Sequence, residues 1–232
     1  MIDYKSRSLK KELLDQDDIP FEDIVLNMKE LDFINTYLGG HSITISGFKK
    51  LLKTRKEISV CEIGCGGGDN LVAIDKFCRR NNVAASFTCI DINTECIAFA
   101  KGNTQIENIS FIISDYKKVF FNKEKPDIIF SSLFCHHFSE EELVEMLLWM
   151  KNNSNIGFFI NDLHRHPVAY HFIKMATTLF SKSYLVKNDA PLSVLRGFRK
   201  SEWKDLFRRA EIKSYSIKWQ WAFRYLVTEF ND

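Results

Sequence analysis

The 232-residue sequence has no long apolar run, almost no net charge and few prolines. Its apolar segments fall well short of the ~20 consecutive residues that cross a membrane, and the charged first 18 residues argue against a signal peptide. The net charge is only +2, whereas nucleic-acid-binding domains usually show a marked basic excess. We therefore expect a cytoplasmic protein with no nucleic-acid partner and no stable membrane insertion, an expectation that leaves peripheral membrane contact open. The sequence leaves the oligomeric state open.

The sequence also lacks any C-x-x-C pair, although it has six cysteines. Without that spacing, a zinc site and a disulfide are both weakly indicated. Reduced, buried thiols in a single well-cored domain are the simpler expectation. The cysteines lie at positions 61, 65, 78, 89, 96 and 135.

Glycine is scarce as well, at ten residues, yet four glycines fall within positions 64–68. This cluster follows an apolar run, Ile58 to Ile63, and precedes helix-compatible sequence over 70–80. Glycines gather in such a turn when the backbone must take a positive φ or lie close to a ligand. The exposed amides and the helix N-terminus then offer hydrogen-bond donors to a polar ligand. The segment predicts a ligand-binding turn between a strand and a helix.

A dinucleotide and S-adenosylmethionine both bind to such turns. The dinucleotide fingerprint G-x-G-x-x-G requires a third glycine where this sequence has Asp69. Glu62, two positions before Gly64, suits a ligand with an ammonium group and would repel a pyrophosphate. The run from Glu62 to Gly68 (E-I-G-C-G-G-G) resembles the E/D-x-G-x-G-x-G motif of class I S-adenosylmethionine-dependent methyltransferases. On this match Glu62, Gly64, Gly66 and Gly68 bind the cofactor S-adenosylmethionine.

Apolar runs and helical segments alternate after residue 55, which predicts an α/β domain with a parallel sheet. The last two strand-like runs, 211–219 and 222–230, are joined by too few residues for a parallel crossover and must form an antiparallel hairpin. The resemblance implies a Rossmann-like three-layer αβα sandwich around a seven-stranded, mostly parallel sheet. We expect a helical lid over residues 1–54 and the cofactor-binding domain over 55–232, with a helical insertion at about 164–200.

Further cofactor contacts are expected where the strands end. On the resemblance, Asp91 accepts hydrogen bonds from the ribose hydroxyls, and Ile92 packs on the adenine. Asp115 accepts from the adenine amine with Tyr116 beside it, and Ser132 faces the methionine part. An alternative for Asp91 is a helix N-cap.

Histidines follow the fourth and fifth predicted strands. The run from Cys135 to Glu141 (C-H-H-F-S-E-E) resembles the C-H-D-W-S-D-E segment of small-molecule O-methyltransferases, whose histidine is the general base. This match makes His136 the base, with an ordinary imidazole pKa near ~6.5. His166 is the second candidate. The alternatives are that His136 packs or caps a helix, and that Asp162 pairs with Arg165. We expect no metal, because the histidines near Asp162 lack a third well-spaced ligand.

These features predict an S-adenosylmethionine-dependent methyltransferase of the small-molecule, quinone-biosynthesis-like branch. The expected reaction is O-methylation of a phenolic, polyketide-like or quinone-like acceptor, because aromatic side chains cluster near the predicted site. One alternative is a lipid-modifying relative that uses residues 168–180 as an interfacial helix, although a buried core helix is the preferred interpretation. Another alternative is a regulatory protein that binds the cofactor without turnover.

Overall fold

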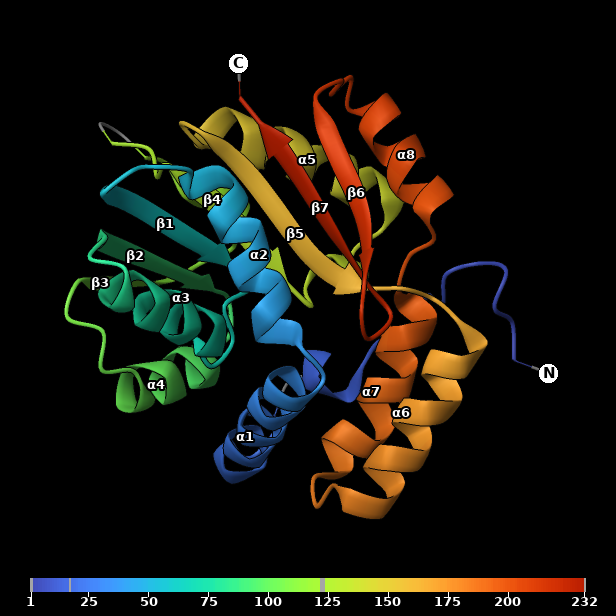
Figure 1. Cartoon of the computed structure of the whole chain (residues 1–232). Helices are drawn as coiled ribbons and strands as arrows, with labels where there is room; N and C mark the ends of the chain where they lie inside the picture. Colours follow the sequence, from blue (N-terminus) through green and yellow to red (C-terminus); the bar gives the residue numbers. More distant parts are fainter. Residues whose placement is uncertain (1, 17, 122–123, 232) are drawn as a thin grey trace.

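A seven-stranded sheet forms the centre of the computed structural model, which describes residues 2–16, 18–121 and 124–231 (Figure 1). The strand order is β3-β2-β1-β4-β5-β7-β6. Neighbouring strands from β3 to β5 run parallel, and β7 is antiparallel to both β5 and β6. The predicted fold, including its C-terminal antiparallel hairpin, is confirmed. The strands are β1 (Glu57–Ile63), β2 (Ala84–Asp91), β3 (Ile109–Ile113), β4 (Ile128–Ser132), β5 (Gly157–Leu163), β6 (Tyr215–Gln220) and β7 (Arg224–Phe230).

Helices cover both faces of the sheet and bury two apolar cores. On one face α2, α3 and α4 bury side chains such as Leu51, Leu71 and Ile97. On the other face α5 and α8 bury Met146 and Trp203. The helices are α1 (Phe21–Tyr37), α2 (Gly40–Leu52), α3 (Asp69–Arg80), α4 (Thr94–Asn103), α5 (Glu140–Asn153), α6 (Pro167–Phe180), α7 (Tyr184–Arg196) and α8 (Lys200–Arg209), with 3-10 turns η1 (Leu13–Asp15), η2 (Tyr116–Lys118) and η3 (Cys135–His137).

The first 54 residues have two different structural settings. Helix α2 belongs to the sandwich, because Gly47 lies directly against the Phe159 ring of β5. Helix α1 and η1 lie beyond the carboxyl ends of the strands, next to α7 (Figure 1). A lid over residues 1–54 therefore stays a prediction, and the packing of α2 restricts it to the residues before Gly40. The predicted domain limits at residues 1 and 232 lie outside the described residues.

The segment predicted as an insertion forms α6 and α7, which lie side by side away from the sheet (Figure 1). The inner side of α6 is buried through Ala169, Tyr170 and Ile173. Its outer side is exposed and carries several large apolar side chains. The preference for a buried core helix over residues 168–180 is therefore wrong for this outer side. None of the described helices is long and apolar enough to span a membrane.

Candidate functional site

The glycine turn lies directly after β1, where the sequence placed it. Gly64, Gly66 and Gly68 have φ values of +66°, +50° and +74°. These angles belong to the left-handed region that side chains with a Cβ rarely adopt. Gly68 precedes α3 as its N-cap residue. The turn therefore needs glycine for its backbone path.

Replacing Gly64 with alanine should destabilise the protein and disturb the cavity beside it. A Cβ at Gly64 would lie 2.2 Å from Phe134 Cδ2, on top of the strain of its positive φ. We expect a loss of at least about 2 kcal/mol in the free energy of unfolding. Chemical denaturation measures this loss. Gly102→Ala is the matched control, because a Cβ there meets nothing within 4 Å. The free energy of unfolding of that variant should rise by about 0.5–1 kcal/mol. Equal stabilities of the two variants would contradict the claim that the turn needs glycine at position 64.

A cavity of about 1340 Å³ lies beside the turn at the carboxyl ends of the strands. Eight of the nine residues predicted to bind the cofactor line it; Gly68 does not and serves the turn instead. The eight are Glu62, Gly64, Gly66, Asp91, Ile92, Asp115, Tyr116 and Ser132. The fold therefore gathers side chains from four strand ends around one cavity.

Glu62 is the buried acidic group of this cavity. Glu62 is only 1% exposed, and its Oε2 has no hydrogen-bond partner among the described residues. Burial raises the pKa of Glu62 well above its usual range, and the charges of Asp69 and Asp91 raise it further. A cationic group placed here would satisfy the carboxylate and reverse this effect. The α-ammonium of S-adenosylmethionine fits that requirement.

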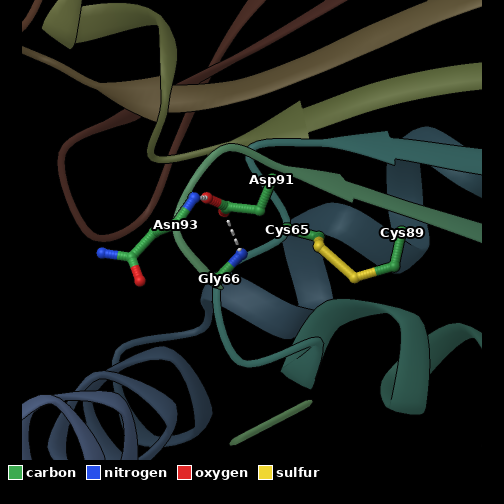
Figure 2. The surroundings of a disulfide bond; sticks show 5 residues. All are labelled: Cys65, Gly66, Cys89, Asp91 and Asn93. Carbon is green, nitrogen blue, oxygen red and sulfur yellow. Dashed lines mark hydrogen bonds between the residues drawn. A yellow bond between two sulfur atoms is a disulfide. The ribbon is translucent and has the colours of Figure 1, made fainter. Parts of the chain in front are cut away.

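Asp91 holds the turn in place (Figure 2). Its Oδ2 accepts from the Gly66 amide at 2.8 Å, and its Oδ1 accepts from the Asn93 amide at 2.9 Å. Burial raises the pKa of Asp91. The N-cap of α4 is Asn93, whose side chain accepts from the Glu95 and Cys96 amides. The alternative that Asp91 is the helix N-cap is therefore wrong. Each carboxylate oxygen keeps a lone pair for a ribose hydroxyl.

The remaining predicted cofactor residues differ in their exposure. Ile92 is 72% exposed at the cavity edge, which leaves an apolar surface open to a flat ring. Asp115 also caps η2 by accepting from the Lys117 amide. Tyr116 is buried and packs edge-on against Phe134, and burial raises the pKa of its hydroxyl. Ser132 is buried at the end of β4.

Two cysteines form a disulfide at the turn (Figure 2). Cys65 lies between Gly64 and Gly66, and its partner Cys89 lies on β2, two residues before Asp91. The expectation of six reduced thiols is wrong for this pair. Spacing along the chain gave no signal, because the parallel pairing of β1 and β2 brings together residues separated by 24 positions. The other four cysteines are free and buried.

Reducing this disulfide should lower the stability of the turn and its strands. Cross-linking across 24 positions stabilises a fold by about 3 kcal/mol in the chain-entropy description. We expect urea denaturation with dithiothreitol to show a loss of that size. A Cys65→Ser/Cys89→Ser variant should not respond to the reductant. A response retained in that variant would assign the effect to other cysteines.

His136 of η3 lies in a buried polar cluster. Its Nδ1 lies 2.8 Å from Asp162 Oδ1, and its Nε2 lies 3.4 Å from Glu12 Oε1. The ring is 2% exposed. Although burial alone lowers its pKa, the charges of Asp162 and Glu12 outweigh burial and raise the pKa of His136 to about 9. The ordinary pKa expected from the sequence is therefore wrong.

His137 faces the cavities from the next position. Its Nδ1 lies 3.0 Å from Asp15 Oδ1, and its side chain is 20% exposed. Glu12, His136 and His137 bring their ligand atoms within 4.8 Å of one another. Arg196 already supplies positive charge there, with its Nε 3.9 Å from Glu12. The absence of a metal stays a prediction.

The second candidate base, His166, lies elsewhere in the described structure. It caps α6, its Nδ1 accepting from the Val168 amide, and it stacks on Phe223. It is not among the residues lining the two cavities. The alternative pair of Asp162 and Arg165 is also wrong, because Arg165 pairs with Glu202.

A second, smaller cavity of about 150 Å³ lies between α1, α6 and α7. His136 and Glu12 line it together with mostly apolar side chains, among them Ile34, Phe172, Ile173 and Phe223. Four residues line both cavities: Leu14, Leu31, Leu133 and His137. The two cavities therefore adjoin along the end of β4.

Sequence reasoning missed Glu12 and Asp15, which complete the histidine cluster. These acids lie in a charged N-terminal segment, which is typical of solvent exposure. Only the tertiary structure carries them to η3, more than 120 positions away. His41 also lines the larger cavity, with Nε2 2.7 Å from Asp69 Oδ2.

The fold and the larger cavity together define the class I methyltransferase architecture. The chain belongs to the methyltransferase domain family, whose model matches residues 54–211. This membership confirms the predicted enzyme class and its cofactor, S-adenosylmethionine. No curated protein matches the chain significantly.

Solved structures resemble the chain over most of its length. A plantazolicin methyltransferase in complex with S-adenosylhomocysteine matches with a TM-score of 0.67 at 20% identity, over 94% of this chain and 91% of that one. An S-adenosylmethionine-dependent methyltransferase from Aquifex aeolicus matches with a TM-score of 0.63 at 15% identity, over 92% and 99%. Human N-acetylserotonin methyltransferase matches with a TM-score of 0.62 at 16% identity, over 91% and 56%. At these identities the similarity establishes the fold.

Proposed function

We propose that this methyltransferase transfers a methyl group from S-adenosylmethionine to a hydroxyl oxygen of a phenolic, polyketide-like or quinone-like acceptor. The observation that carries the proposal is the junction of the two cavities. The larger cavity has the cofactor residues, and the smaller one has His136. Leu133 and His137 line both, so an acceptor in the smaller cavity would reach the cofactor there.

The smaller cavity suits one aromatic ring. Its volume of about 150 Å³ is close to that of an engineered apolar cavity that binds benzene. Its apolar wall comes from α1, α6 and the β6–β7 turn, and its polar end is formed by Glu12 and His136. A planar acceptor would place its ring against the apolar wall and its hydroxyl at the polar end.

We assign the proton-accepting role to His136. Asp162 holds Nδ1, which leaves Nε2, on the side of Glu12, as the nitrogen that would take the proton. A carboxylate in this position fixes the tautomer and stabilises the imidazolium that forms. His166 lines neither cavity, which favours His136 over it. Only the neutral form of His136 can accept a proton. Because its pKa is raised, this form is the minor one at neutral pH.

The chain's other residues bind and orient. When bound, S-adenosylmethionine supplies an activated methyl group with a positive charge on sulfur, so alignment and proton removal are what the protein must add. Glu62 would hold the ammonium group of the cofactor, and Asp91 would hold its ribose. Phe134 contacts the glycine turn and lines the larger cavity, where it would help to position the cofactor.

The test is the formation of S-adenosylhomocysteine with a panel of free phenols and hydroxyquinones. We expect product only when an acceptor with a free hydroxyl is present, and none with the corresponding methyl ethers. The matched ethers keep the ring and its apolar contacts while removing the reacting group. Cofactor binding without product from any hydroxyl acceptor would instead support the regulatory alternative.

A further inference from the structure

Helix α6 presents an exposed apolar stripe. Val168, Phe172, Met175 and Leu179 follow one another at helical spacing and are 57%, 44%, 58% and 66% exposed. Phe180, at the end of the helix, is 82% exposed. Scattered exposed apolar residues are ordinary, but a continuous stripe on one helix marks an interaction surface.

The segment that carries the stripe is basic in its own sequence. No acidic residue occurs between Asp162 and Asp189 in the sequence. Lys174, Lys182 and Lys187 are exposed in this segment. From α1, Glu30 accepts hydrogen bonds from the backbone of Lys182 and Ser183, and Asp23 lies beside the hydroxyl of Tyr184. An apolar helix face with flanking lysines is typical of helices that lie on anionic membranes.

The same helix forms a wall of the acceptor cavity. Phe172 lines this cavity while remaining partly exposed, and Ala169 and Ile173 line it from the inner side of α6. The outer stripe and the cavity are therefore continuous through Phe172. A ligand leaving a bilayer beneath α6 would meet the cavity without crossing an aqueous gap.

We propose that α6 lies in the interface of an anionic lipid bilayer and admits a membrane-dissolved acceptor to the smaller cavity. The admission of an acceptor rests on the proposed function, whereas the binding of α6 to a bilayer does not. A second copy of the chain fits this surface less well, because a symmetric contact would bring the same three lysines together. A lipid surface with negative headgroups complements both the stripe and its charges.

Vesicle co-sedimentation tests the proposal without any acceptor. The purified full chain should sediment with vesicles of equal parts phosphatidylcholine and phosphatidylglycerol, and bind pure phosphatidylcholine vesicles more weakly. High salt should weaken binding to the anionic vesicles. Met175→Ser/Leu179→Ser should reduce binding at least ~10-fold, since both side chains would lose burial in the lipid. Lys174→Glu/Lys182→Glu should reduce it as well.

Phe120→Ser is the matched control, because Phe120 is 80% exposed but lies on the loop after η2. It should bind like the unmutated chain. Failure of the unmutated chain to bind anionic vesicles would overturn the proposal, as would full binding by the α6 variants. A stable dimer that Met175→Ser/Leu179→Ser dissociates in light scattering would also overturn it, in favour of a second copy. Methylation of water-soluble phenols is measured separately. If the chain methylates them but does not bind vesicles, the proposed function stands and the membrane proposal fails. If the chain binds vesicles but methylates no hydroxyl acceptor, the proposed function fails.

Discussion

Replacing His136 with alanine should lower kcat about 10²–10⁴-fold, the usual contribution of general-base assistance. The affinity for S-adenosylmethionine should change little, because His136 lines the smaller cavity and the predicted cofactor residues line the larger one. Steady-state kinetics and calorimetric titration with the cofactor measure the two quantities. His171→Ala is the matched control, since His171 is an exposed histidine on α6.

The alanine substitution also leaves two buried carboxylates without their partner, which destabilises a fold. Circular dichroism must therefore show that the variant is folded. Asp162→Asn provides a second measurement, because it keeps the shape of the cluster while removing the charge that orients the ring. It should lower kcat with cofactor affinity intact. Full activity in both folded variants would assign the proton to water or to an already ionised acceptor.

The pH dependence of kcat should also report the titration of His136. Because the pKa of His136 is raised to about 9, log kcat should rise with pH through the neutral range until about pH 9. The His136→Ala variant should lose this limb. The free energy of unfolding should change in the opposite direction. Protonated His136 stabilises the fold because its pKa is higher in the folded state than the ~6.5 of the unfolded chain, so its contribution is complete below pH ~6.5 and is lost as the pH rises through about 9. Thermal unfolding across that pH range measures it.

Asp91→Ala should weaken binding of S-adenosylmethionine by roughly 10–150-fold. The loss of a charged acceptor for ribose hydroxyls costs on the order of 1.5–3 kcal/mol. Asp91 also holds the Gly66 amide at 2.8 Å, so the turn should loosen in the same variant. Calorimetric titration measures the affinity.

Asn93→Ala separates the cofactor role of Asp91 from helix capping. Asn93 lines the same cavity and caps α4, so its removal should cost about 1 kcal/mol of stability and leave most of the affinity. Normal affinity in Asp91→Ala with a collapsed melting temperature would contradict the cofactor role.

The grouping of these residues around the larger cavity could be predicted because they are local to strand ends. Glu62 and Asp91 lie at the ends of β1 and β2, and the glycine turn follows β1, whose apolar run is visible in the sequence. The parallel sheet then brings those ends together, so position along the chain is enough. Gly68 does not line the cavity and serves instead as the N-cap residue of α3.

The histidine cluster and the disulfide could not be predicted in the same way. The raised pKa of His136 comes from Glu12 and Asp162, which lie far apart in the sequence. Cys65 meets Cys89 only through the register of β1 against β2. The exposure of the α6 stripe was missed because helical periodicity alone does not say which face another element covers. Each of these features depends on long-range packing.

The position of the transferred methyl group tests the central claim most directly. One acceptor that offers a phenolic hydroxyl, an aromatic amine and an open ring carbon is incubated with the enzyme and carbon-13-labelled S-adenosylmethionine, and the product is examined by nuclear magnetic resonance. The proposed geometry predicts a single labelled methyl group on the oxygen, and its loss in His136→Ala. A label on nitrogen or carbon, formed at the same rate in that variant, would contradict the assignment of His136 as the base of an O-methyltransferase.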